Sequence, residues 1–256
     1  MSVAAVISNV THQFDEHPAL SNVSLTLNAG ESVAFLGPSG AGKSTLLALL
    51  DGRLRNWCGT AEVLETPYSA TALPPRNARS DVGFIFQEFA LVDRLSVYQN
   101  VMNGRLGRMR TWQSLWSRFG ERDHLVVSGV LEDTGLIDLA ARRADKLSGG
   151  QRQRTAIARC LAQEPKLILA DEPVSNLDPA NAEKILGLIT GAARKRGITV
   201  VFSSHQPELS QRFADRIIGL RDGKLLFDRP SGQVSAADIS ELYHGASPSA
   251  ELRVVS

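Results

Sequence analysis

Cysteine is scarce in this chain of 256 residues, which contains only Cys58 and Cys160. Neither lies near a second cysteine or a histidine at the spacing of metal ligands. This excludes a disulfide framework and a cysteine-based metal site, and it suits a reducing cytosol.

Long apolar runs are absent as well. None approaches the roughly 18 residues of a membrane-spanning helix. Residues 1–17 also lack the basic start and apolar core of a signal peptide. If the protein works at a membrane, another chain must hold it there.

Charge of one sign is not in surplus, because 28 Lys and Arg residues face 27 Asp and Glu residues. This balance argues against nucleic acid as a partner. Hydrophobic residues make up 43% of the chain, which is enough for a buried core, and no internal repeat indicates a solenoid. The length therefore predicts one large domain or a core with a sizeable insertion.

Two kinds of predicted strand define the fold class. The first part of the chain alternates like half-buried strands, as in residues 3–10 and 23–27. Short, almost continuously apolar runs, typical of a sheet buried on both faces, occur at 32–36, 167–170 and 198–202. Each connects to a predicted helix, at 44–50, 179–195 and 207–214. The sequence therefore predicts an α/β fold with a parallel sheet.

Between Gln87 and Leu147 the spacing of apolar residues becomes helical. The pattern is carried by Val97, Val101, Leu115, Leu125, Val130, Leu131, Leu136 and Leu139. We therefore expect a helical insertion here, and at the end of the chain a short helix over 236–243 followed by a loose tail.

A phosphate-binding loop is predicted between the strand at 32–36 and the helix at 44–50. The pattern G-x-x-x-x-G-K-[ST] is formed by Gly37, Pro38, Ser39, Gly40, Ala41, Gly42, Lys43 and Ser44, with Thr45 following. Its backbone N–H groups can converge on phosphate oxygens, Lys43 can reach the β- and γ-phosphates, and the Ser44 hydroxyl can ligate Mg²⁺. The alternative is a glycine-rich turn that only caps a helix.

Two carboxylates, Asp171 and Glu172, follow the buried run at 167–170. Adjacent residues on an extended chain point in opposite directions. Asp171 can therefore hold the metal while Glu172 faces the attacking water as a general base or orienting group. Taken alone, such a pair also occurs in solvated loops.

A second glycine-rich helix start lies in Leu147-Ser-Gly-Gly-Gln151. It offers a backbone anion site, but the first loop already binds the phosphates of its own subunit, so the second must serve another subunit's nucleotide. With the phosphate loop before it and the two carboxylates after it, this segment resembles the signature of ABC-type ATPases. The resemblance covers about residues 3–228 and implies that Ser148, Gly149, Gly150 and Gln151 bind ATP held by a partner.

Further positions match the family one by one. Gln87 resembles the glutamine that senses Mg²⁺ or the attacking water, and the resemblance makes it a metal-site residue together with Ser44 and Asp171. His205 resembles the switch histidine on the γ-phosphate, although a lone histidine after a strand is usually incidental. Residues 175–178 resemble the loop that touches the opposite subunit, and Phe14 stands where the family commonly has a tyrosine stacked on adenine.

The resemblance implies a P-loop NTPase of the ABC type, with an N-terminal antiparallel β subdomain and an inserted helical subdomain. We expect the ATPase domain over residues 1–228, with the helical subdomain at about 88–160, and a short C-terminal extension over 229–256. The resemblance implies ATP and Mg²⁺ as cofactors. It also implies that two ATP molecules hold a homodimer together, and that hydrolysis followed by phosphate release lets the subunits part.

A single nucleotide-binding domain without membrane spans resembles the detached ATPase subunit of a bacterial importer. That implies integral membrane permease subunits, a periplasmic or lipid-anchored solute-binding protein, no nucleic acid, and a peripheral place on the cytoplasmic face of the inner membrane. The stretch Asn100-Val-Met-Asn-Gly-Arg-Leu-Gly107 resembles a segment of phosphonate importer ATPases, and His205-Gln206 fits the same group. Phosphonates or related phosphorus oxyanions are therefore the expected solutes.

Several alternatives stay open. A stripe of apolar residues fits a groove for a partner but also the core of the insertion; it consists of Trp112, Leu115, Trp116 and Phe119. The arginines of the phosphonate-type segment, Arg105, Arg108 and Arg110, also fit a solvated face. Another importer, an exporter or a lipoprotein-releasing system would share the same catalytic residues. A soluble ABC ATPase acting on nucleic acid is disfavoured, because the chain lacks paired domains, a long coiled coil and a basic surplus.

Overall fold

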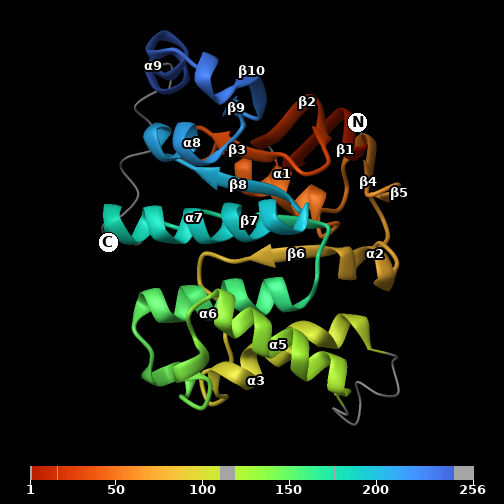
Figure 1. Ribbon diagram of the computed structural model, residues 1–256. Coiled ribbons are helices and arrows are strands. Elements are labelled where there is room, and N and C mark those ends of the chain that lie inside the picture. Colours follow the sequence, from red (N-terminus) through yellow and green to blue (C-terminus); the bar gives the residue numbers. More distant parts are fainter. Residues whose placement is uncertain (1, 16, 110–118, 176, 245–256) are drawn as a thin grey trace, which may run out of the picture.

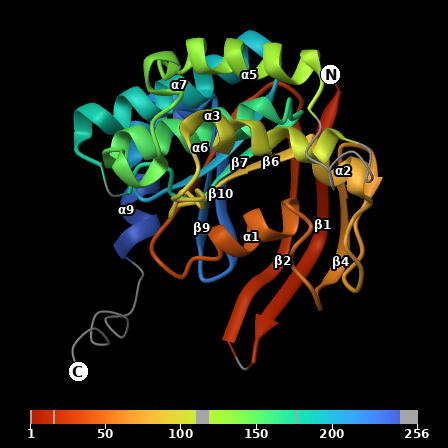
Figure 2. The ribbon, with the colours of Figure 1, turned by 90° about the horizontal axis from the view of Figure 1, so that it is seen from below.

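The structure is a computed structural model that describes residues 2–15, 17–109, 119–175 and 177–244. Within these residues the strands form two sheets (Figures 1 and 2). The antiparallel sheet has the order β2-β1-β4-β5 and consists of β1 (Val3–Phe14), β2 (His17–Asn28), β4 (Cys58–Val63) and β5 (Thr66–Pro67).

The larger sheet has the order β10-β9-β3-β8-β7-β6. It consists of β3 (Ser32–Leu36), β6 (Val82–Ile85), β7 (Leu167–Ala170), β8 (Thr199–Ser204), β9 (Arg216–Arg221) and β10 (Lys224–Pro230). Strands β9, β3, β8, β7 and β6 are parallel, and β10 returns antiparallel beside β9. The predicted α/β fold with a parallel sheet is confirmed.

The larger sheet is buried on both faces, because alternate residues of its strands enter two cores. Phe35 and Leu169 pack on α1 (Lys43–Leu50) and the antiparallel sheet. Leu36 and Ile168 pack on the other face, against α6 (Gly149–Ala162) and α7 (Pro179–Arg196). All four residues are almost fully buried, as the continuous apolar runs predicted.

The connection from β6 to its parallel neighbour β7 carries most of the helices in the lower half of Figure 1. They are α3 (Val97–Met102), the 3-10 helices η1 (Asn103–Arg108), η2 (Ile137–Leu139) and η3 (Ala144–Lys146), α5 (Glu121–Asp133) and α6. Helix α2 (Arg76–Asp81) precedes β6. The insertion is thus helical in pieces, and its boundaries at about 88–160 stay a prediction.

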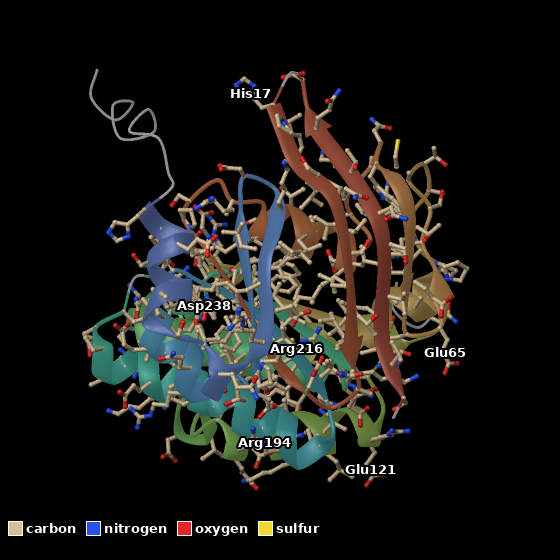
Figure 3. The ribbon with its side chains drawn as sticks, turned by 90° about the horizontal axis from the view of Figure 1, so that it is seen from above. His17, Glu65, Glu121, Arg194, Arg216 and Asp238 are labelled. Carbon is tan, nitrogen blue, oxygen red and sulfur yellow. The ribbon has the colours of Figure 1, made fainter. Side chains whose placement is uncertain are left out.

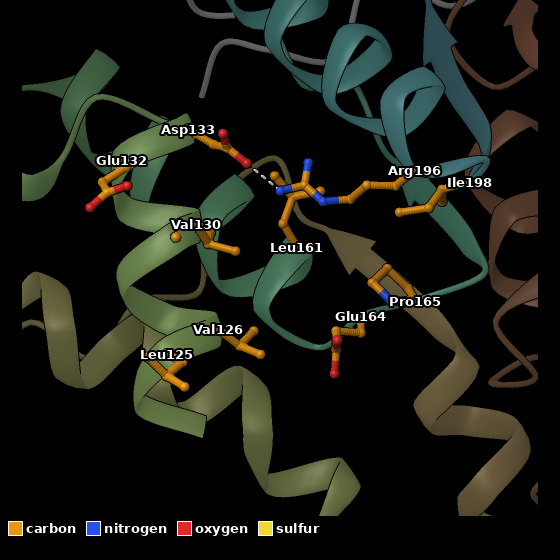
Figure 4. A pocket seen from close by; sticks show the side chains of 11 residues that line it. Leu125, Val126, Val130, Glu132, Asp133, Leu161, Glu164, Pro165, Arg196 and Ile198 are labelled. Carbon is orange, nitrogen blue, oxygen red and sulfur yellow. Dashed lines mark hydrogen bonds and ion pairs between the residues drawn. The ribbon is translucent and has the colours of Figure 1, made fainter. Parts of the chain in front are cut away.

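Among the described residues of the predicted apolar pattern, one lies on the surface. Leu125 is 68% exposed, whereas Val97, Val101, Val130 and Leu131 are buried. Leu125 points into an open groove of about 560 Å³ between α5 and the end of α7, which the ion pair of Arg196 with Asp133 crosses (Figure 4). The groove is larger than the nucleotide cleft described below, but no predicted site residue lines it.

The interpretation of the arginines as a solvated face is wrong for Arg105. Its side chain is 4% exposed, pairs with Asp123 at 2.8 Å and Glu164 at 2.6 Å, and donates to the Ala162 carbonyl. Arg108 pairs with Asp81 at 2.7 Å. These bonds fasten η1 to α5, to α2 and to the loop before β7.

Asn100 is also part of the internal framework. Its fully buried side chain accepts from the Val92 N–H and donates to the carbonyls of Val92 and Ser96. Of the other residues named for this region, Phe119 is partly buried against the core. Arg110, Trp112, Leu115 and Trp116 lie outside the described residues.

The last described elements lie on the larger sheet. After α8 (Pro207–Phe213) and the β9–β10 pair, η4 (Ser231–Gln233) leads into α9 (Ala236–His244), which confirms the predicted terminal helix. The predicted tail, 245–256, lies outside the described residues. Among the residues that the structure describes, no helix combines the length and apolar character needed to cross a bilayer.

Candidate nucleotide site

The predicted phosphate loop connects β3 to α1, and two of its glycines are required by their surroundings. Gly42 has φ +100°, and a Cβ there would lie 2.5 Å from the Ala19 carbonyl oxygen. A Cβ on Gly37 would lie 2.1 Å from the Leu220 carbonyl oxygen. Any side chain at either position would displace backbone, so the loop can keep this shape only with glycine.

Lys43 begins α1 and is held inside this loop. Its side chain is 4% exposed, and Nζ donates to the carbonyls of Gly37 at 2.8 Å and Pro38 at 2.9 Å. Burial lowers the pKa of Lys43, and the carboxylates of Glu172 and Asp171 oppose that change. A buried ammonium of this kind is best stabilised by a strongly anionic ligand, such as a phosphate chain.

A cleft of about 370 Å³ opens beside the loop. Its lining joins segments that are distant in sequence: Phe14, His17, Pro18, Ala19, Ser39, Gly40, Ala41, Gly42, Lys43, Ser44, Thr45 and Glu172. Sequence analysis missed His17, Pro18 and Ala19. The signal that could have found them is their place in the hairpin directly after Phe14.

Asp171 follows β7 and lies against α1 and β8. Its Oδ1 accepts from the Ser44 hydroxyl at 3.0 Å and from the Ser203 hydroxyl at 2.7 Å. Ser203 also accepts from the Glu172 N–H at 2.7 Å, so one serine links the two acidic residues. The hydroxyl and carboxylate oxygens of Ser44 and Asp171 are the donor types that Mg²⁺ prefers.

Glu172 is not on extended chain, which corrects the premise of the sequence analysis. Its φ is +42°, because the chain turns sharply after β7. The turn directs the Glu172 carboxylate into the cleft, where Oε2 lies 3.9 Å from Nδ1 of His205. Asp171 and Glu172 do face different neighbours, but through this turn rather than through strand alternation.

Gln87 is linked to Glu172 indirectly, through Ser175. Its Nε2 donates to the Ser175 hydroxyl at 3.2 Å, and that hydroxyl donates to the Glu172 carbonyl at 3.2 Å. The described bond of Gln87 is therefore with the loop after Glu172 rather than with Ser44 or Asp171. Asp178 ends this loop as the N-cap of α7 and accepts from the Asn181 N–H.

The predicted signature residues lie at the start of α6, away from the cleft. Ser148 is the N-cap: its hydroxyl accepts from the Gln151 N–H, and the Gln151 side chain accepts from the Ser148 N–H. The described lining of the cleft includes none of the residues 148–151. Beyond the adjacent residues and the backbone of α6 itself, no described atom lies within 4 Å of a Cβ built on Gly149 or Gly150, so packing within this chain does not require glycine there.

Phe14 provides the exposed aromatic surface of the cleft. Its side chain is 56% exposed, and its ring meets the buried His12 ring edge-on at 4.5 Å between centroids.

We expect Phe14→Ala to weaken ATP binding by about 1–2 kcal/mol through lost base stacking. Phe14→Tyr should bind normally. Titration with a fluorescent ATP analogue tests this, and equal affinity for the alanine variant would remove Phe14 from the adenine site.

Comparison with known proteins identifies the class. Residues 20–175 match the ABC transporter family, and this range contains the phosphate loop, Gln87, the 147–151 segment and both acidic residues. The chain therefore belongs to the ABC transporter family, as an ABC-type ATPase. The family and the fold class predicted from the sequence are confirmed.

Two of the curated relatives most similar to this chain share one name. The chain is 40% identical to phosphonates import ATP-binding protein PhnC 1 of Nostoc sp., over 98% of this chain and 96% of the relative. It is 44% identical to phosphonates import ATP-binding protein PhnC of Thiobacillus denitrificans, over 94% of this chain and 92% of the relative.

Solved structures agree with this fold. A dimeric ATP-binding cassette in a post-hydrolysis state with ADP and Pi is 33% identical, with a TM-score of 0.76 over 89% of this chain and 98% of that one. The ADP conformation of another ABC transporter cassette is 25% identical, with a TM-score of 0.81 over 96% of this chain and 100% of that one.

Proposed function

We propose that the chain is the ATP-hydrolysing subunit of a bacterial ABC importer that drives uptake of phosphonates or related phosphorus oxyanions. The observation that carries the solute class is the identity of 40–44%, along nearly the whole chain, with phosphonates import ATP-binding proteins. The cleft supports the ATPase part, because it combines an anion-binding loop, a buried lysine and an acidic residue facing the same space.

ATP would lie with its adenine on Phe14 and its phosphates along residues 37–45. Lys43 would exchange the carbonyls of Gly37 and Pro38 for the β- and γ-phosphates, which supply stronger charge-assisted bonds. Ser44 and Asp171, already within 3.0 Å of each other, would hold Mg²⁺, and Gln87, now bonded to Ser175, would join them as the third metal-site residue. When bound, Mg²⁺ neutralises part of the phosphate charge.

Hydrolysis requires a group that orients water and one that contacts the γ-phosphate. Glu172 faces the cleft and can accept a proton from the attacking water, and His205 beside it can donate to a γ-phosphate oxygen. The bond from Gln87 to Ser175 connects the start of the helical insertion with the loop after Glu172. Movement of the insertion can therefore reach the catalytic carboxylate.

The signature residues would act on a second copy of this chain. Ser148 and Gly149 are exposed and Gly150 is partly exposed at a helix start, where they can close on the γ-phosphate held by the partner of a homodimer. The helical subdomain, at about residues 88–160 of an ATPase domain spanning 1–228, would transmit closure. The extension over 229–256 completes the proposed domain organisation.

The complex would include integral membrane permease subunits and, indirectly, a periplasmic or lipid-anchored solute-binding protein. The ATPase would sit peripherally on the cytoplasmic face of the inner membrane. These partners follow from the importer function of the named relatives. Nucleic acid is not among them, since the charge of the chain is balanced.

Growth of the host tests the solute. A strain carrying Lys43→Ala in place of this chain should grow on phosphate and fail on an alkylphosphonate as sole phosphorus source, because ATP binding is lost. Lys195→Ala, an exposed lysine at the end of α7, is the matched control and should grow on both. Equal growth of the Lys43→Ala strain on both sources would contradict the proposed solute.

A further inference from the structure

Helix α9, to which the sequence assigned no role, is fixed to the ATPase core. Leu242 is fully buried, and Ile239 and Tyr243 pack partly buried on the same core. Asp238 pairs with Arg229 at 3.3 Å. Figure 3 shows α9, marked by Asp238, beside the β9–β10 pair. The helix is therefore a docked element whose position is defined by several independent contacts.

The last turn of this helix contacts the candidate switch histidine. The Tyr243 hydroxyl donates to the His205 carbonyl at 3.1 Å, across 38 residues of sequence. Nδ1 of the His205 side chain lies 3.9 Å from Oε2 of Glu172, which lines the cleft. A residue of the C-terminal extension is thus one hydrogen bond away from a residue at the candidate catalytic centre.

The peptide between His205 and Gln206 is held at both of its polar ends. Tyr243 binds its carbonyl, and the Ser204 hydroxyl accepts from its N–H, on Gln206, at 2.9 Å. Fixing a peptide plane limits ψ of the residue before it, and that angle helps to set the direction of the His205 side chain. Of these two contacts, only that of Tyr243 comes from outside the loop itself.

The chemistry of Tyr243 suits a permanent donor. Burial raises the pKa of Tyr243 to about 12, and the carboxylate of Glu208 acts in the same direction. The hydroxyl consequently keeps its proton throughout the pH range in which proteins work.

We propose that Tyr243 is a positioning residue for ATP hydrolysis, which holds the His205 backbone so that the imidazole meets the γ-phosphate. This inference rests on the proposed function of His205. It gives the C-terminal extension a part in the reaction, because Tyr243 on α9 holds the carbonyl of His205 while the imidazole of His205 lies 3.9 Å from Glu172.

The test removes one hydroxyl and keeps the ring. In the full chain, Tyr243→Phe should lower kcat for ATP hydrolysis about two- to tenfold, the usual value of one hydrogen bond. KM for ATP should stay unchanged, because the phosphate loop is untouched, and the melting temperature should fall by no more than about a few degrees, because the ring keeps the packing of α9. An unchanged kcat, or a raised KM with normal kcat, would overturn the proposal.

Tyr98→Phe is the matched control. Its hydroxyl also makes a described hydrogen bond, to Nδ1 of His124 at 2.5 Å, but on the helical insertion rather than at the His205 loop. It should leave kcat unchanged. A loss of kcat as large as that of Tyr243→Phe would show that removing a tyrosine hydroxyl has only a general effect, which overturns the proposal.

His205→Ala separates the role of His205 from that of Tyr243. If it abolishes hydrolysis while Tyr243→Phe is normal, His205 keeps its role and the bracing by Tyr243 is wrong. If His205→Ala hydrolyses ATP normally, the proposed role of His205 and the bracing both fail. In the His205→Ala background, Tyr243→Phe should cause no further loss of the residual rate, and an additional loss would place the action of Tyr243 elsewhere.

Discussion

Glu172→Gln should lower ATP hydrolysis by about 10²- to 10⁴-fold, the range for loss of a general base. The amide has nearly the same size as the carboxylate but cannot take a proton from water. Because Glu172 lines the cleft beside Lys43 without bonding the phosphate loop, ATP binding should persist. Removing a negative charge beside the γ-phosphate should even favour the ATP-bound dimer.

Two measurements follow this variant. Single-turnover hydrolysis gives the rate, and size-exclusion chromatography with ATP and Mg²⁺ shows whether a stable dimer accumulates. Glu121→Gln, at the exposed start of α5 (Figure 3), is the control for losing one carboxylate and should behave like the unmodified protein. Hydrolysis within a few-fold of normal would exclude Glu172 as the base.

The phosphate loop could be predicted from the sequence because its geometry is local. The glycine spacing, the preceding apolar strand and the following helix together define the loop that holds Lys43 and Ser44. The buried strands of the larger sheet could be predicted for the same reason, since burial on both faces leaves a continuous apolar run.

The remaining contacts of the site depend on segments far apart in sequence, which no local pattern specifies. Ser203 links Asp171 to the Glu172 N–H from a neighbouring strand, 31 and 32 residues away. The turn at Glu172 departs from the strand alternation used to interpret it. Ser203-Ser204 directly before His205 was the available signal, but only the sheet order shows which carboxylate it meets.

The interpretation of Arg105 as part of a solvated face is wrong for the same reason, because its partners are distant in sequence. Three arginines within six residues are typical of a solvated face. The partners that allow Arg105 to be buried, Asp123 and Glu164, lie 18 and 59 residues away. A buried charge is tolerated only when such partners converge on it, and their convergence is a property of the fold.

Ser148→Arg should abolish hydrolysis in a dimer of identical subunits while leaving the subunit's own cleft intact. Ser148 is exposed at the start of α6, where a long cation would stand between the helix and a partner's γ-phosphate. Loss of the N-cap costs only about 1 kcal/mol, so the fold should survive. Nucleotide binding by the isolated subunit should therefore be normal, whereas Lys43→Ala should lose it.

Mixing the two inactive variants tests the arrangement in trans. In a dimer of one Ser148→Arg and one Lys43→Ala subunit, the intact phosphate loop of the first meets the intact signature of the second. Random pairing of equal amounts of the two variants makes about half of the dimers mixed, and each mixed dimer has one working site of two. The mixture should therefore regain up to about one quarter of normal hydrolysis. Wild-type rates, or no recovery at all, would contradict the trans arrangement.

The matched control uses the placement of Glu172 in the same cleft as Lys43. In a mixture of Glu172→Gln with Lys43→Ala, one site lacks the base and the other lacks the lysine, so no site is complete. This mixture should therefore stay inactive, although it too combines two variants with substitutions at different positions. Recovery with Ser148→Arg but not with Glu172→Gln would assign the signature to the partner's nucleotide and the base to the subunit's own nucleotide. This division is the one expected from an exposed Ser148 at the start of α6 and a buried Lys43 at the start of α1.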